Sequence, residues 1–175
     1  NHRIMLTHST GLSKKGWAFT VSGSRRYAGE GYVPGSYYDG WSYFAAIDKK
    51  IGEKHLLSLT GFGAPTESGR QGPAVTEMIK LAGTNFYNPF WGYQNGKVRN
   101  ASIAKTHQPY IILTHDFRIS NTTNLTTAAG YSFGDRSTTA LDWYNSADPR
   151  PDYYRYLPSY YKTTDPGQSA MLEEA

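Results

Sequence analysis

The segment Gly40–Ala64, GWSYFAAIDKKIGEKHLLSLTGFGA, has the pattern of two β-strands joined by a short charged turn. In its first half every second residue is aromatic or aliphatic, a period of two that is typical of a strand. These residues are Trp41, Tyr43, Ala45 and Ile47. In its second half the large apolar residues divide between both faces, so the orientation of that strand stays open. They are Leu57 and Leu59 on one face, and Leu56 and Phe62 on the other.

The same pattern recurs along the chain and predicts an all-β protein. Tyrosine, glycine, threonine and serine are abundant while leucine and glutamate are few, which favours strands and turns over helices. We expect about six strands. They span roughly residues 3–10, 16–26, 40–50, 54–64, 106–119 and 123–134.

The connections between these strands alternate in length. GLSKKG, KKIGEK and ISNTTN are short, whereas the connections over roughly residues 27–39, 65–105 and 135–175 are long. In an up-and-down antiparallel meander, alternate connections emerge at opposite ends of the sheet. Short turns at one end and long loops at the other are typical of an outer-membrane β-barrel. We therefore expect a transmembrane barrel segment, and since known bacterial barrels have at least about eight strands, six would be part of a larger one.

The alternation also predicts which residues share a face. We expect one set to face lipid, namely Trp17, Phe19, Val21, Ile111, Leu113, Phe117 and Leu125. The opposite set would face a wet lumen, and it consists of Thr20, Ser22, Gln108, Asp116, Thr126 and Ser132. A further group would form aromatic girdles at the lipid headgroups, or would pack in the core of a soluble protein. These aromatic residues are Trp17, Trp41, Tyr43, Tyr131 and Phe133.

The long connections carry most of the remaining aromatic residues. The segment Asp142–Lys162, DWYNSADPRPDYYRYLPSYYK, has prolines spaced so closely that we expect an irregular loop without helix or central strand. Its tyrosines either hold the loop together or contact a ligand, and both alternatives stay open. The candidate ligand-binding residues in these loops are Trp91, Tyr93, Trp143, Tyr144, Tyr153 and Tyr154.

Residues that would indicate catalysis, metal binding or nucleic-acid binding are not clustered. The chain has no cysteine, and its five histidines are dispersed along the sequence. It contains no nucleophile elbow, P-loop or dinucleotide fingerprint. Its net charge of +4 is scattered rather than concentrated in a stripe. We expect neither an enzyme, nor a metal or cofactor site, nor a nucleic-acid partner.

Several longer stretches resemble TonB-dependent outer-membrane receptors. They include SRRYAGEGYVPGSYYDGWSYFAAIDKKIGEKHLLSLTGFGAP, NFYNPFWGYQNGKVRN and ALDWYNSADPRPDYYRYLPSYY. The resemblance implies a barrel of about 22 strands with a plugged lumen, located in the bacterial outer membrane. It also implies import of a nutrient, powered through an inner-membrane energy-coupling protein.

The resemblance implies several partners as well. These are the remainder of the barrel and its plug, the lipid and lipopolysaccharide of the outer membrane, and a surface lipoprotein. Because the chain begins as though inside a strand, we expect it to be a piece of a longer polypeptide. Two alternative functions stay open. The first is a secreted β-domain that binds glycans through exposed aromatic residues, and the second is a structural barrel without transport.

Overall fold

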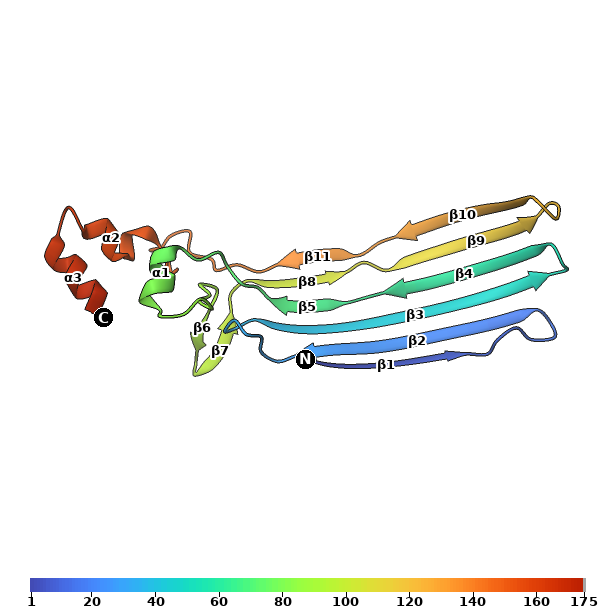
Figure 1. The fold of residues 1–175 in the computed structure, drawn as a ribbon, viewed down its shortest axis with the longest axis horizontal. Helices are drawn as coiled ribbons and strands as arrows, with labels where there is room; N and C mark the ends of the chain where they lie inside the picture. The colour runs from blue at the N-terminus through green and yellow to red at the C-terminus, as the bar shows by residue number, and fades with distance from the viewer. Residues whose placement is uncertain (175) are drawn as a thin grey trace. The chain divides into compact units, whose positions relative to one another are not determined.

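The computed structural model describes residues 1–174, which form two compact units. The sheet unit comprises residues 1–28, 38–67 and 105–137, and the loop unit comprises residues 29–37, 68–104 and 138–174. Figure 1 shows the strands and helices of both units. Six elements carry most of the sheet, and they are β1 (His2–Ser9), β2 (Trp17–Ala28), β3 (Tyr37–Ile51), β4 (His55–Gly63), β9 (Tyr110–Arg118) and β10 (Asn124–Ser132).

These six strands form the predicted antiparallel meander. β1 pairs with β2, β2 with β3, β3 with β4, β4 with β9 and β9 with β10, and every pair is antiparallel. The connection between β3 and β4 is the shortest, and Gly52 adopts a positive φ of 61° in it, a conformation that glycine reaches without strain. Within residues 1–174 the outer edges of β1 and β10 have no strand partner, so the described sheet is open and forms no closed barrel.

Three of the long strands are interrupted. β5 (Thr66–Gly69) continues the line of β4, β8 (Ile103–His107) precedes β9, and β11 (Asp135–Thr138) follows β10. Pro65, Pro109 and Gly134 stand at the interruptions, and Pro65 and Pro109 have no amide hydrogen to donate to a neighbouring strand. Their carbonyl groups still bridge to the neighbours, since Trp41 N donates to Pro65 O at 2.9 Å and Phe133 N to Pro109 O at 3.3 Å. The predicted boundaries at residues 64 and 134 therefore coincide with these breaks rather than with the ends of pairing.

The pairing register sorts the side chains onto two faces. Val21, Ala45 and Ile111 occupy one row across the sheet, whereas Thr20, Ala46 and Ile112 occupy the next row and point to the other side. By this alternation one face, the apolar face, carries all seven residues predicted to share a side. They are Trp17, Phe19, Val21, Ile111, Leu113, Phe117 and Leu125.

The opposite face, the polar face, carries five of the six residues predicted for it. These are Thr20, Ser22, Asp116, Thr126 and Ser132. Gln108 lies in the break between β8 and β9, outside both strands. Apolar side chains interrupt the polar face, because Phe62 stacks on Tyr110 there with ring centroids 5.4 Å apart. Leu57 and Leu59 lie with the apolar face, which resolves the orientation of β4.

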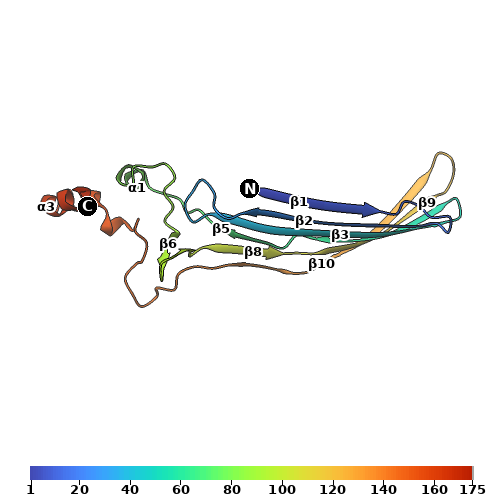
Figure 2. The ribbon, with the colours of Figure 1, turned by 90° about the horizontal axis from the view of Figure 1, so that it is seen from below.

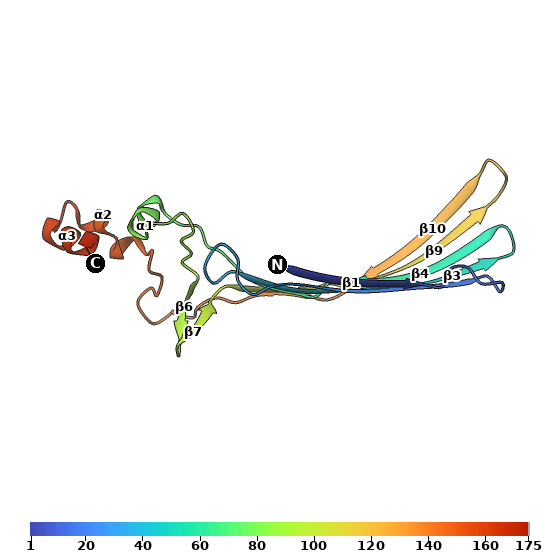
Figure 3. The same cartoon turned by 60° about the horizontal axis from the view of Figure 1, so that its bottom comes forward.

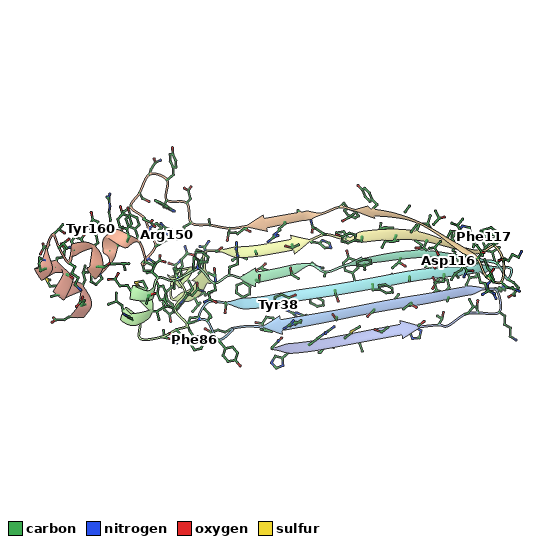
Figure 4. All side chains as sticks on the ribbon, turned by 45° about the horizontal axis from the view of Figure 1, so that its top comes forward. Tyr38, Phe86, Asp116, Phe117, Arg150 and Tyr160 are labelled. Atoms are coloured by element: carbon green, nitrogen blue, oxygen red, sulfur yellow. The ribbon has the colours of Figure 1, made fainter. Side chains whose placement is uncertain are left out.

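No second layer covers either face within the sheet unit, where the strands form a single curved layer (Figures 2 and 3). Side chains stand out on both sides of the strands (Figure 4). Val21 exposes 54% of its surface, and the large apolar side chains around it are similarly exposed. Among the aliphatic and aromatic residues of 1–174, Leu157 of the loop unit is the single buried one. The sheet unit therefore has no hydrophobic core of its own.

The loop unit contains more regular structure than expected. Within predicted loop 65–105 lie α1 (Thr76–Leu81) and the two-stranded sheet of β6 (Trp91–Gln94) and β7 (Lys97–Asn100). The segment 142–162 holds a 3₁₀ turn, η1 (Tyr154–Tyr156), and α2 (Pro158–Tyr161), and it is followed by α3 (Pro166–Glu174). The prediction that no helix forms there was wrong. Pro158 lies in the first turn of α2, where its missing amide hydrogen has no partner to lose.

The helices of residues 1–174 are all too short or too polar to cross a membrane.

Candidate ligand-binding site in the loop unit

Two buried asparagines hold three stretches of the loop unit together. Asn88 Nδ2 donates to Pro34 O at 2.9 Å, and its Oδ1 accepts from the amide groups of residues 72 and 90. Asn100 Nδ2 donates to Gly35 O at 2.9 Å and to Arg70 O at 2.8 Å. Because a side-chain amide both donates and accepts, each asparagine pairs backbone groups that no strand partner satisfies. The loop unit is thus held by polar contacts where a hydrophobic core is lacking.

The hairpin formed by β6 and β7 turns through Asn95 and Gly96. Both residues have positive φ, 53° and 74°, as the commonest two-residue hairpin turn requires. The register pairs Gly92 with Arg99 and Tyr93 with Val98. Side chains alternate along each strand, so Gly92, Gln94 and Arg99 lie on one face of the hairpin and Trp91 and Tyr93 on the other. Trp91 and Tyr93 contact each other edge to face, with ring centroids 5.7 Å apart.

An ion pair with a buried carboxylate shapes the irregular segment after the sheet. The Asp148 side chain is 3% exposed, and Arg150 Nε donates to its Oδ1 at 2.9 Å. These hydrogen bonds lower the pKa of Asp148 and raise that of Arg150. The guanidinium also lies over the Trp143 ring, 5.8 Å from its centroid. Tyr156 Oη closes the loop by donating to Asp148 O at 3.0 Å.

The tyrosines beyond this ion pair form a cluster of their own. Tyr153 contacts both Tyr154 and Tyr156 edge to face, with ring centroids 4.8 and 5.3 Å away. Tyr154 contacts Tyr160 in the same manner at 5.6 Å. Arg155 Nε donates to the Tyr154 hydroxyl at 3.0 Å, which lowers the pKa of that phenol. The segment from Arg150 to Tyr160, whose two end residues are labelled in Figure 4, therefore has ring contacts within itself, and Ser159 also donates two hydrogen bonds to the Glu77 carboxylate, at 2.8 and 2.6 Å.

A cavity of about 360 Å³ lies beside the hairpin, entirely within the loop unit. Its walls come from β6, β7 and the irregular segment, and most are apolar. They include Phe90, Leu141, Pro149 and Pro151, with Gly92, Gln94 and Arg99 from one face of the hairpin. Its volume lies within the range of small-molecule sites, about 300 to 1,000 Å³, but most of its wall residues are exposed, so it is a shallow surface cavity.

The six candidate residues do not converge on one site. Trp91 and Tyr93 line the cavity, whereas Tyr153 and Tyr154 belong to the tyrosine cluster. Trp143 lies against Arg150, and Tyr144 is 93% exposed. Gln94, Arg99 and the prolines of the cavity wall were not predicted from the sequence. The Asn95-Gly96 turn was the available signal, because a two-residue hairpin there places Arg99 opposite Gly92.

The histidines are dispersed along the sequence, but two of them meet in the sheet. His55 Nδ1 lies 3.0 Å from His115 Nε2, and Phe117 stacks on His55 with ring centroids 4.4 Å apart. The pairing of β4 with β9 brings these residues together, a contact that sequence distance does not reveal. Two imidazoles are fewer ligands than protein metal sites use, and residues 1–174 contain no group of three or more potential ligands.

No known protein family, curated protein sequence or solved structure matches this chain.

Proposed function

We propose that this chain supplies six adjacent strands and part of the extracellular loops of a TonB-dependent outer-membrane receptor that imports a nutrient. The observation that carries the proposal is the apolar face, a continuous exposed hydrophobic surface on a sheet with no covering layer. Soluble proteins rarely expose apolar patches beyond a few hundred Å², whereas a barrel wall presents such a face to lipid.

The extent of the apolar face supports a membrane band. Cation–aromatic contacts stand near both of its ends, with Lys49 Nζ 4.5 Å from the Trp17 ring and Arg25 Cζ 4.8 Å from the Trp41 ring. The eight residue steps from Trp17 to Arg25 along β2 span about 26 Å at about 3.3 Å per residue. A strand tilt of about 40° reduces that height to about 20 Å, near the apolar band of about 25 Å in known barrels.

The polar face supports a water-filled interior. Hydroxyl groups bond across neighbouring strands there, with Thr7 and Ser22 oxygens 2.8 Å apart and Ser24 and Ser42 oxygens 2.7 Å apart. Thr126 donates to the Asp116 carboxylate on the same face. Small polar residues and a carboxylate suit contact with water and would be costly against lipid.

The two free sheet edges support completion by further strands of the same receptor. An open edge leaves amide and carbonyl groups unpaired, and lipid provides no hydrogen-bond partners for them. The proposed receptor also contains the remaining strands and a plug inside the lumen. It works with an inner-membrane energy-coupling protein. Lipopolysaccharide would contact the apolar face, and a surface lipoprotein would meet the long loops.

The native absence of cysteine allows a direct test of this topology. Tyr144→Cys, in the loop unit, and Asn121→Cys, in the short β9–β10 turn, are each introduced singly and treated with a membrane-impermeant maleimide. We expect Tyr144→Cys to react on intact cells and Asn121→Cys to react only after the outer membrane is opened. Equal labelling of both on intact cells, or recovery of the protein in the medium, would reject the proposal. Recovery in the medium would instead favour the secreted glycan-binding domain.

A further inference from the structure

One residue on the wall of the cavity beside the β6–β7 hairpin has no side chain. This residue is Gly92, and a β-carbon at this position would meet no atom within 4 Å. Its φ is not positive, so the backbone itself does not require glycine. A side chain added at this exposed position would therefore extend into open space beside the cavity wall.

Arg99 is the one cationic side chain on that wall, and it stands directly across from Gly92. Its Nη1 donates to Gln94 Oε1, a neutral acceptor. None of the ion pairs within residues 1–174 involves Arg99, so its charge has no acidic partner there. A guanidinium presents a planar pair of donors whose geometry matches a carboxylate.

The rest of the wall selects the body of the ligand. Leu141, Pro149, Pro151 and Ala101 offer hydrocarbon surface without hydrogen-bonding side chains. These four residues suit the apolar body of a ligand, and Trp91, Tyr93 and Gln94 of the same wall add side chains that can hydrogen-bond. A single positive charge also suits a monoanion better than a doubly charged phosphate.

We propose that this cavity binds a small organic carboxylate with an apolar body, such as the C-terminal residue of a short peptide, and that Arg99 pairs with its carboxylate. The apolar body lies in the space in front of Gly92, against the proline wall. The inference names the cargo class of the receptor proposed above and rests on that function for its biological role. Binding itself depends only on the loop unit.

The test compares two probes of equal shape on the complete receptor proposed above, purified in detergent. N-acetyl-L-phenylalanine carries the carboxylate, and N-acetyl-L-phenylalaninamide replaces it with a neutral amide. Isothermal titration should show the acid binding about tenfold or more tightly, as a hydrogen-bonded charge pair predicts. Equal binding of the two probes, or no binding of either, would overturn the proposal.

Two variants, each with a matched control, locate the site. Arg99→Gln should lose the preference for the acid, while Lys97→Gln, on the same face of the same strand but outside the cavity wall, should keep it. Gly92→Leu should abolish binding of both probes by filling the cavity, while Val98→Leu, at a residue outside the cavity wall, should not. Circular dichroism of each variant checks that the fold is retained. Acid binding that survives Gly92→Leu in a folded protein would refute this location.

The outcome is separable from that of the labelling experiment. Acid-selective binding together with maleimide labelling on only one side of the membrane supports both proposals. If labelling rejects the membrane topology while the acid still binds through Arg99, the receptor proposal fails and the carboxylate site stands.

Discussion

Gly35 faces the Trp91 side chain with no room for a β-carbon between them. Gly35 also has a φ of +72°, which glycine adopts without strain and other residues rarely do. The contact joins the connection between β2 and β3 to the hairpin of β6 and β7, two segments that are distant in sequence. Two independent requirements, backbone conformation and close packing, therefore act on one residue.

Gly35→Ala should destabilise the loop unit more than a left-handed backbone alone explains. Gly83→Ala is the matched control, because Gly83 has a similar φ of +63° but a β-carbon added there would meet no atom within 4 Å. The control should cost about 1–2 kcal/mol, the strain of one left-handed residue. Limited proteolysis of the loops compares the stability of the two variants. Equal protease resistance would show that close packing of Gly35 against Trp91 adds nothing.

Asn100→Ala should loosen the loop unit through lost polar contacts. The change removes two donated hydrogen bonds and the one that Oδ1 accepts from Ser102 N at 2.8 Å. Arg70 O keeps a hydrogen bond from Asn88 Nδ2 at 3.3 Å, but Gly35 O and Ser102 N lose the Asn100 side chain, and unpaired buried backbone groups cost about 1–3 kcal/mol each, so the loss should reach several kcal/mol. Asn145→Ala, at an exposed turn position, should stay within about 0.5 kcal/mol. Chemical denaturation followed by tryptophan fluorescence compares the two.

Low pH should destabilise the loop unit because the Asp148 carboxylate becomes protonated. Hydrogen bonds from Arg150 hold the pKa of Asp148 below its ordinary value. The stabilisation is therefore complete above about pH 4, the ordinary range of an aspartate, and is lost as the pH falls through the lowered folded-state pKa. Asp148→Asn should be less stable at pH 7 and change less between about pH 5 and 2. Asp142→Asn should keep the wild-type profile, and an identical profile for both variants would remove Asp148 from the explanation.

Ala45 and Ala46 allow the two faces to be compared with one substitution. They are adjacent in β3, and the register places Ala45 on the apolar face and Ala46 on the polar face. If the apolar face meets lipid, Ala45→Arg should cost roughly 2–4 kcal/mol for membrane insertion and Ala46→Arg much less. Folding into phospholipid vesicles at increasing urea concentrations measures the difference. Similar costs at both positions would argue against a lipid-facing side.

The sheet was largely predictable from sequence because period-two alternation reports a strand whose two faces meet different surroundings. Val21 beside Ser22 and Leu125 beside Thr126 carry that signal locally. The continuations of β4 and β10 were missed, since Pro65 and Gly134 resemble strand ends when no partner strand is known. The contact between His55 and His115 depends on register between strands that are 60 residues apart.

The candidate site was less predictable than the sheet. The aromatic content of the loops pointed to Trp91 and Tyr93. The open space beside Gly92 could not be predicted, because the sequence does not show which glycines border a cavity. Arg99 looked like one scattered cation among many. Its lack of an acidic partner within the described residues is a three-dimensional property.

The interruptions at Pro65, Pro109 and Gly134 affect how paired strands of the sheet separate. In an unbroken ladder each opened hydrogen bond exposes the next, so separation of two strands spreads along their whole length. Here β4, β9 and β10 each meet a position where regular pairing already stops. Separation of β4, β9 or β10 that starts at the short turns would therefore pause at these positions, whereas the uninterrupted pairs of β1 with β2 and of β2 with β3 would open along their whole length.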